Sequence, residues 1–119
     1  MKRDFEVIRD ILRMVERSNG PLFDIDEISD ASRDLVIYNV VLLDEAGLII
    51  ADWEELSDYR LIVNAIHRLT WEGHEFLDAA KNKGVWNKTR EYLRQRSSDV
   101  PFHIFQNLLI KFLNEAIIQ

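Results

Sequence analysis

The sequence contains no cysteine, and this absence removes two classes of site. A chain without cysteine has neither a disulfide framework nor a thiolate metal site, which suits a reducing compartment. Long apolar runs are also missing, since no stretch approaches the roughly 18 apolar residues of a membrane-spanning helix. The first 18 residues place acids among their apolar positions, unlike an export signal. We therefore expect a cytoplasmic protein that is neither exported nor embedded in a membrane.

Sequence motifs of catalysis are absent as well. The chain has no glycine-rich phosphate loop, no nucleophile elbow and no Ser/His/Asp order. The three histidines, His67, His74 and His103, have no zinc-binding spacing with one another. His74 and Asp78 are four residues apart and could share a metal, but two ligands do not make a site. We expect no catalytic, cofactor-binding or metal-binding residues, and therefore no enzyme.

Length and charge set further limits. With 119 residues, 47% of them hydrophobic, the chain can bury one core and is too short for two ordinary domains. Its net charge of −6 is uneven: residues 1–18 carry +1, residues 19–59 carry −10 and residues 60–119 carry +3. Phosphate contacts need lysine and arginine on the docking face. The acidic middle third is therefore poorly suited to approach a polyanion.

The first half of the chain predicts two long helices. Apolar residues recur at helical spacing over residues 4–18, and an Asn-Gly-Pro sequence then stops that helix. Ser32 is placed to cap a second helix, and Gly47 to end it in the left-handed conformation. Between the two helices, residues 24–31 leave room for at most a turn or two of helix.

A hairpin and a third helix are expected next. The segments 48–51 and 61–68 are β-branched and apolar enough to pair, with residues 55–59 as the tip. Thr70 can then cap a helix. Gly73, in the first turn of that helix, lowers helix propensity by about 1 kcal/mol relative to alanine, which calls for a local reason. We expect that reason to be a close approach between this helix and the hairpin.

This order of elements is that of a winged-helix domain, in which a helix, a turn and a second helix precede a two-stranded wing and a further helix. We predict an α+β, mostly helical, winged-helix-like fold with a hairpin wing of two or three strands. The alternative is an α+β domain of another topology. Residues 1–80 would form the winged-helix-like domain, and residues 81–119 a C-terminal helical extension that packs on the core or forms a dimer seam.

Three segments resemble a known family. They are DEAGLI at residues 44–49, RLTWEGHEFLDAA at 68–80 and VWNKTRE at 85–91. With the starting sequence MKRD, they resemble the bacterial and phage family called domain of unknown function 2513, over residues 1–96. The resemblance implies a winged-helix-like fold and a bacterial, phage or prophage origin, but no activity. It also implies a histidine, in many members, where this chain has Asn39, so a shared histidine-dependent chemistry is not expected.

Winged helices often bind DNA through a helix in the major groove, here the helix over residues 33–46. Apart from Arg33 and Asn39, its exposed positions are expected to be Asp34, Asp44 and Glu45. Such a face would repel a duplex, and one arginine cannot supply the several phosphate contacts that hold a reader in place. We interpret these three acids as a candidate acidic face for protein interaction.

A second candidate surface for nucleic acid is basic. It covers residues 81–96 and consists of Lys81, Lys83, Lys88, Arg90, Arg94 and Arg96. Cations interleaved with Trp86 and Tyr92 could bind phosphate while the rings stack on bases. The same cations equally suit helix C-termini and ion pairs with the acidic block, and Trp86 suits an inward position. We favour this structural interpretation of the basic patch.

The C-terminal segment predicts a helix from Pro101 onward, with apolar residues over an arc of roughly 200°, about twice the minimal stripe. One side should meet the protein's own core, and the other side needs a partner. A second copy is the simplest partner, because cyclic dimers are the commonest assembly. The candidate dimer seam consists of Phe105, Leu109, Ile110, Phe112, Leu113 and Ile117. The alternative is a helix buried on two sides within one monomer.

Taken together, the sequence favours a non-enzymatic protein of bacterial or phage type that acts as a protein-interaction or regulatory module. Its expected partner is a protein, including a second copy of itself, and we expect no cofactor, metal or membrane. The alternative is a DNA-binding transcriptional regulator that uses either the basic helix over residues 81–96 or the helix over residues 33–46.

Overall fold

The computed structural model of the chain describes residues 1–96 and 100–118. They belong to two compact units, Met1–His74 and Glu75–Gln119. The division falls inside helix α3 (Trp71–Ala80), whereas the predicted domain boundary lies at the last residue of that helix.

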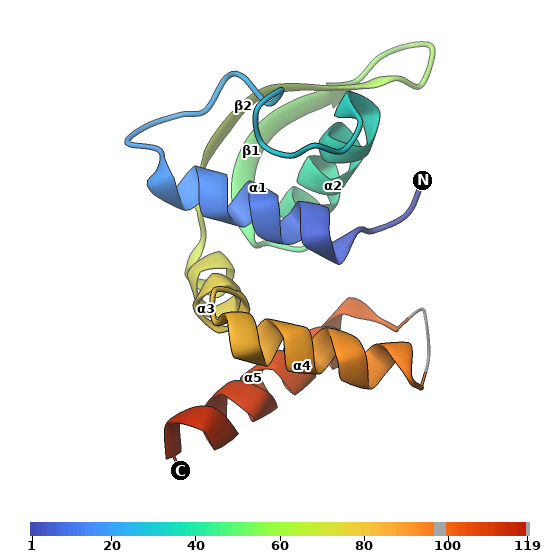
Figure 1. Ribbon diagram of the computed structural model, residues 1–119. Coiled ribbons are helices and arrows are strands. Elements are labelled where there is room, and N and C mark those ends of the chain that lie inside the picture. Colours follow the sequence, from blue (N-terminus) through green and yellow to red (C-terminus); the bar gives the residue numbers. More distant parts are fainter. Residues whose placement is uncertain (97–99, 119) are drawn as a thin grey trace. The chain divides into compact units, whose positions relative to one another are not determined.

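The first unit has the winged-helix-like arrangement. Two helices, α1 (Phe5–Arg17) and α2 (Arg33–Glu45), precede a two-stranded antiparallel hairpin of β1 (Ile49–Glu55) and β2 (Leu61–Leu69) (Figure 1). Helix α1 packs on α2 and on β2, and α2 packs on both strands. The predicted α+β, mostly helical fold with a hairpin wing is confirmed. In the described stretch 18–32, the chain forms turns but no helix.

Local signals set the ends of both helices. The Asp4 carboxylate caps α1 by accepting hydrogen bonds from the backbone N–H groups of Glu6 and Val7, at 3.0 and 3.1 Å. Ser32 Oγ caps α2 by accepting from Leu35 N at 3.3 Å. Gly47 follows α2 with φ of 80°, a left-handed conformation that glycine adopts at little cost. The two predicted end signals of α2 are thus confirmed.

The core of the first unit is formed by the inward faces of α1 and α2 and by the ends of the strands nearest to them. Its buried apolar side chains are Val7, Ile8, Ile11, Leu12, Val15, Ile25, Ile28, Val36, Ile37, Val40, Val41, Leu43, Leu48, Ile49, Ala65, Ile66 and Leu69. Burying one such leucine, isoleucine or valine contributes about 1.5 to 3 kcal/mol. This shared core fixes α2 against the hairpin, and so it positions the acidic residues and the groove of the first unit described below.

The hairpin contains two irregularities. Its register pairs Trp53 with Val63 and Asp52 with Ala65, and a second shift occurs between Ile50 and Ala51, so β2 carries one extra residue at each place. On its other edge, Ile66 pairs with Leu22 from the segment after α1, through two backbone hydrogen bonds of 2.8 and 2.9 Å. The two extra residues of β2 are β-bulges, which bend a strand and increase its twist.

The junction between β2 and α3 is tightly bonded. Thr70 N donates to Leu48 O at 3.0 Å, and Thr70 Oγ1 donates to Gly47 O at 2.6 Å while accepting from Gly73 N at 3.1 Å. A Cβ placed on Gly73 would lie 2.0 Å from Leu48 O. The predicted cap and the predicted close approach are both confirmed, because only glycine leaves room for the Leu48 carbonyl here.

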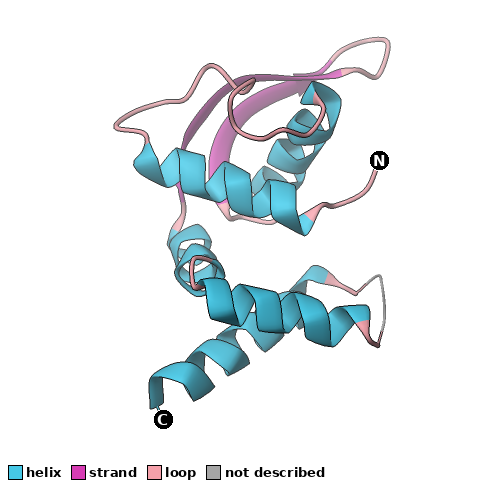
Figure 2. Cartoon of the chain, viewed as in Figure 1, coloured by secondary structure: helices cyan, strands magenta, loops and turns pink. Residues whose placement is uncertain are grey.

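The second unit contains the rest of α3 together with α4 (Lys83–Arg94) and α5 (Phe102–Ile118), which packs on α4 (Figure 2). An aromatic cluster forms its centre. The Phe76 ring lies 5.1 Å from Phe102 and 6.4 Å from Phe105, and Trp86 meets Phe105 edge-on at 5.3 Å between ring centroids. Trp86 is therefore a buried core residue, as predicted.

Candidate protein-interaction surfaces

The acidic block of residues 19–59 is a surface in the folded protein. Of its eleven acids, ten are exposed and only Asp44 is half-buried. The exposed ones are Asp24, Asp26, Glu27, Asp30, Asp34, Glu45, Asp52, Glu54, Glu55 and Asp58. The block contains a single cation, Arg33, which pairs with Asp26, and the neighbouring Arg60 pairs with Asp58 at 2.7 Å. Arg33 and Arg60 thus have carboxylate partners inside the protein.

Asp44 has a structural role that the sequence did not indicate. Its two carboxylate oxygens accept hydrogen bonds from Ala51 N at 3.0 Å and from Trp53 Nε1 at 2.9 Å. An acid at a helix C-terminus is unfavourable in the helix dipole, and these two bonds offset that cost. Asp44 therefore ties the end of α2 to β1, and a substitution there would disturb folding as well as any docking.

The other two predicted acids, Asp34 and Glu45, lie at opposite ends of α2. Eleven residues separate them, which corresponds to about 16 Å along a helix axis. Asp34 is in the first turn, where the helix dipole favours an acid, whereas Glu45 is the last helical residue, where the dipole disfavours one. The two exposed acids are therefore separate charges at the two ends of α2, and they affect helix stability in opposite directions.

A groove opens in the first unit between the start of α2 and the hairpin. Its volume is about 630 Å³, and its walls include Ile37 and Tyr38 from α2, and Tyr59, Leu61 and Val63 from the hairpin. Figure 1 shows the hairpin tip and the start of α2 at the same end of this unit as the N-terminus. Sequence reasoning did not identify the groove, because its two walls are 17 or more residues apart in the chain.

Tyr59 has an unusual backbone conformation for a bulky residue. It is the third residue of a three-residue hairpin loop closed by a hydrogen bond from Leu56 N to Arg60 O at 2.8 Å. Its φ is 68°, a left-handed value that is normally left to glycine at this place in a hairpin. The side chain is 83% exposed, so no burial in the described protein repays the strain. Such outliers concentrate at functional sites.

The predicted basic patch is exposed, but several of its cations have partners. Lys88 Nζ lies 3.7 Å from the Glu115 carboxylate and 4.6 Å from the centre of the Phe112 ring. The Arg96 guanidinium stacks on Tyr92, 3.7 Å from the ring centre. These contacts agree with the structural interpretation of the patch. Its role in binding nucleic acid stays a prediction.

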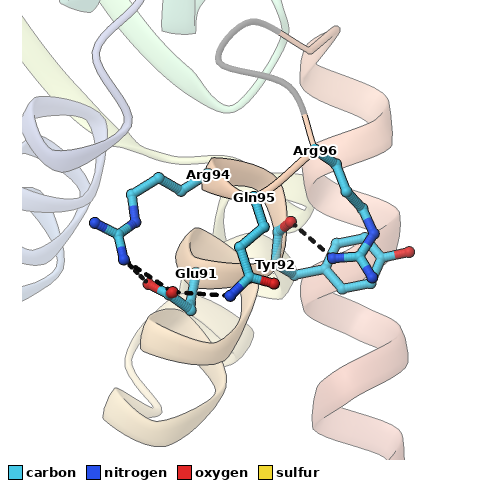
Figure 3. A network of polar contacts seen from close by, with 5 residues as sticks. All are labelled: Glu91, Tyr92, Arg94, Gln95 and Arg96. Carbon is cyan, nitrogen blue, oxygen red and sulfur yellow. Dashed lines mark hydrogen bonds and ion pairs between the residues drawn. The ribbon is translucent and has the colours of Figure 1, made fainter.

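Arg94 and Glu91 form the best-bonded pair on this surface (Figure 3). Arg94 Nη2 donates to both Glu91 oxygens at 2.9 and 2.7 Å, and Gln95 Nε2 donates to the same carboxylate at 3.1 Å. The hydrogen bonds from Arg94 lower the pKa of Glu91 below its ordinary value, and the same bonds raise the pKa of Arg94. Arg94 would have to leave this pair to contact a phosphate.

The predicted dimer seam divides into inward and outward residues. Phe105, Leu109 and Phe112 are buried within the described protein, and Leu113 is half-buried. Ile110 and Ile117 are 38% and 70% exposed. Only these two of the six candidates are left on the surface, and the dimer stays a prediction.

The three histidines are all exposed. In the part of the chain that the structure describes, no group of three or more His, Asp or Glu side chains is arranged to hold a metal ion. None of the helices among the described residues is both long and apolar enough to cross a membrane.

Comparison with known proteins places these features in a family. The family described as "Hypothetical protein (DUF2513)" matches residues 2–99. The chain belongs to this family. A relative from Haemophilus influenzae, named "Uncharacterized protein", is 36% identical over 104 residues, which cover 84% of this chain and 85% of the relative. The resemblance seen in the sequence is thereby confirmed. No solved structure matches the chain.

Asn39 corrects one expectation. It occupies the position at which the DUF2513 resemblance implies a histidine in many members, and it was expected to be exposed on α2. Its exposure is 0%. The side-chain oxygen accepts from Asp4 N at 2.9 Å, and the amide donates to Leu35 O at 2.9 Å. Asn39 thus fixes the segment before α1 to α2 and is unavailable to a base edge in a DNA groove.

One sequence signal could have indicated the Tyr59 conformation. The segment between the two strands, Leu-Ser-Asp-Tyr-Arg, contains no glycine or asparagine, although a short hairpin loop needs a residue with positive φ. A residue other than glycine or asparagine must therefore take that place. No comparable local signal indicates the bonds of Asp44 and Asn39.

Proposed function

We propose that this DUF2513 protein is a non-enzymatic protein-interaction or regulatory module of bacterial or phage type, which acts in the cytoplasm. Its first unit would dock basic partner proteins through the exposed acids along α2 and the hairpin. The observation that supports the proposal is that ten of the eleven acids of residues 19–59 face solvent, while the one cation of that block is paired with Asp26. Complementary charge raises the rate of encounter between proteins and weakens with salt.

The position of Glu45 supports the same proposal, because its charge lowers the stability of α2. It is exposed at the C-terminal end of α2, where the helix dipole disfavours a negative charge by about 0.3 to 1 kcal/mol. An acid that lowers helix stability is explained by a role outside the fold. Asp34 is in the first turn of the same helix, where the dipole favours a negative charge, so the two acids can be compared in one experiment.

The test uses these two acids. Glu45→Lys should stabilise the fold and Asp34→Lys should destabilise it, by about 0.3 to 1 kcal/mol each. Both should weaken capture of a partner by the immobilised protein from a lysate of its source organism, and the association should weaken as salt is raised. Asp78→Lys, an exposed position in the second unit with the same charge change, is the matched control. Capture that is unaffected by both α2 variants would refute docking through this surface.

DNA binding is the second candidate, because the helix and wing have the arrangement of DNA-binding winged helices. It is less favoured, since α2 is acidic and the basic patch is partly engaged in internal contacts. A gel-shift experiment with random duplex DNA separates the two. A salt-dependent shift that is abolished by reversing the charge of Lys88, Arg90 and Arg94 would replace the protein-docking proposal with DNA binding.

A further inference from the structure

We infer that the groove between α2 and the hairpin binds an extended peptide that adds as a strand to the outer edge of β2. The peptide would carry apolar residues at alternating positions and lysine or arginine between them. The inference rests on the proposed protein-docking function and names the kind of segment that docks.

The backbone groups of β2 point alternately to β1 and to the outer edge of the hairpin. Arg60 O and Thr70 N bond toward β1, whereas Ile66 N and O bond away from it, to Leu22. N–H and C=O groups alternate between the two edges of a strand, and each bulge inserts one extra residue. Alternation from Arg60 therefore turns the N–H and C=O groups of Leu61 and Val63 to the outer edge. Among the described residues, Leu22 supplies the one pairing on that edge, at Ile66.

The groove borders this part of β2, between the hairpin and the start of α2. Leu61, Ile62 and Val63 all line it, although consecutive side chains of a strand point to opposite faces. Because it touches three consecutive residues, the cavity reaches the backbone of this part of β2, where the outward N–H and C=O groups of Leu61 and Val63 lie. An extended peptide can bond to them, whereas a helical segment has no free backbone groups to offer.

The walls of the groove carry apolar and aromatic side chains. Ile37, Leu61 and Val63 provide apolar contacts, and Tyr38 and Tyr59 provide two aromatic side chains. Tyr59 is held in its left-handed conformation with an exposed side chain, and it lines the groove. A peptide in the groove would cover that side chain, which gives the strained residue a function.

The groove also has charged residues in its walls. Asp34 and Glu55 line the groove, and the arginines that line it, Arg33 and Arg60, already pair with Asp26 and Asp58. A basic peptide therefore meets the carboxylates of Asp34 and Glu55, which lie outside these two ion pairs. In a peptide with alternating apolar and basic residues, the apolar side chains would lie against the walls and the basic side chains would lie toward Asp34 and Glu55.

The experiment begins with a displayed library of random nonapeptides selected on the whole chain. The expected result is enrichment of alternating apolar and basic sequences. The strongest binder is then synthesised with N-methyl groups on every second amide, in two complementary sets. One set should lose binding at least tenfold and the other should keep it, because a strand pairs through alternate amides only. Hydrogen exchange should slow at the amides of Leu61 and Val63 when peptide is bound.

Variants of the protein test the same edge. Val63→Pro removes an outward N–H and no bond to β1, so the hairpin should form while peptide binding falls at least tenfold. Val63→Ile keeps the N–H and the β-branched side chain, and it should retain binding. Tyr59→Gly relieves the left-handed strain and should fold but bind at least threefold more weakly, which keeps the test usable if Val63→Pro does not fold.

Several results would overturn the inference. These are no enrichment, enrichment of helical or proline-rich sequences, equal loss in the two N-methyl sets, or protection at amides outside β2. A dimer of the chain that Val63→Pro dissociates would place a second copy at the edge instead. Partner capture that depends on Glu45 but is unchanged by Val63→Pro would leave the proposed function in place and remove the groove from it.

Discussion

Replacing Gly73 by alanine is the sharpest test of the joint between the hairpin and α3. The new Cβ would lie 2.0 Å from Leu48 O and 3.0 Å from Leu48 C, both backbone atoms, so the backbone itself must move. Leu48 O also accepts the hydrogen bond from Thr70 N, and separating the two segments would break it.

The magnitude follows from three contributions. Overpacking of this kind costs about 1 to 3 kcal/mol, and the lost hydrogen bond costs about 1 kcal/mol. Alanine regains about 1 kcal/mol of helix propensity relative to glycine. We expect Gly73→Ala to lower the free energy of unfolding by about 1 to 3 kcal/mol, measured by urea denaturation followed by circular dichroism.

The chain contains its own control for this substitution. Gly84 is also in the first turn of a helix, α4, and a Cβ there would meet its nearest atom, Asn82 Oδ1, at an ordinary 3.5 Å. Gly84→Ala should be neutral or stabilising by up to about 1 kcal/mol. If both substitutions shift the urea midpoint in the same direction and by the same amount, the contact with Leu48 does not constrain Gly73.

Further substitutions test other features by the same denaturation or by light scattering. Thr70→Ala should cost about 1 kcal/mol through loss of the helix cap, with Thr70→Ser as a control that keeps the hydroxyl. Asp44→Ala should cost about 1 to 3 kcal/mol because it leaves two donors without their acceptor, and a neutral outcome would contradict its bonds to β1. Tyr59→Gly should stabilise by about 0.5 to 1 kcal/mol, and a loss of stability would show that the left-handed residue is not strained. Ile110→Glu with Ile117→Glu should convert a dimer to a folded monomer, whereas a monomeric unmodified chain at micromolar concentration would end the dimer prediction.

Local signals made much of the fold predictable. Ser32, Gly47 and Thr70 each act within a few residues of their own position, whereas Gly73 marks a close approach to Leu48, 25 residues away. All four predictions agree with the structure. Such cap and turn signals depend on side-chain chemistry at fixed offsets, so a single sequence reveals them.

The surface of α2 could not be predicted in the same way. Its sequence, Leu-Val-Ile-Tyr-Asn-Val-Val-Leu-Leu, is apolar almost all round, so periodicity does not separate its inward from its outward face. Asn39 was therefore taken as exposed, although it bonds to Asp4, 35 residues away. Asp44 was taken as a docking acid, although its partners are on β1. Polar side chains that bond to distant segments leave no mark in local sequence.

The two bulges of β2 affect how the hairpin behaves in a crowded solution. An uninterrupted open edge would template the addition of further strands, and sheets of different molecules could join without limit. In β2 each extra residue shifts the alternation of outward groups, and Leu22 occupies the edge at Ile66. The open part of the edge is thereby confined to a few residues beside the hairpin tip. Deleting Asn64 would remove the bulge nearer the hairpin tip and lengthen the regular edge of β2. We expect the shortened protein to aggregate more readily when it is concentrated.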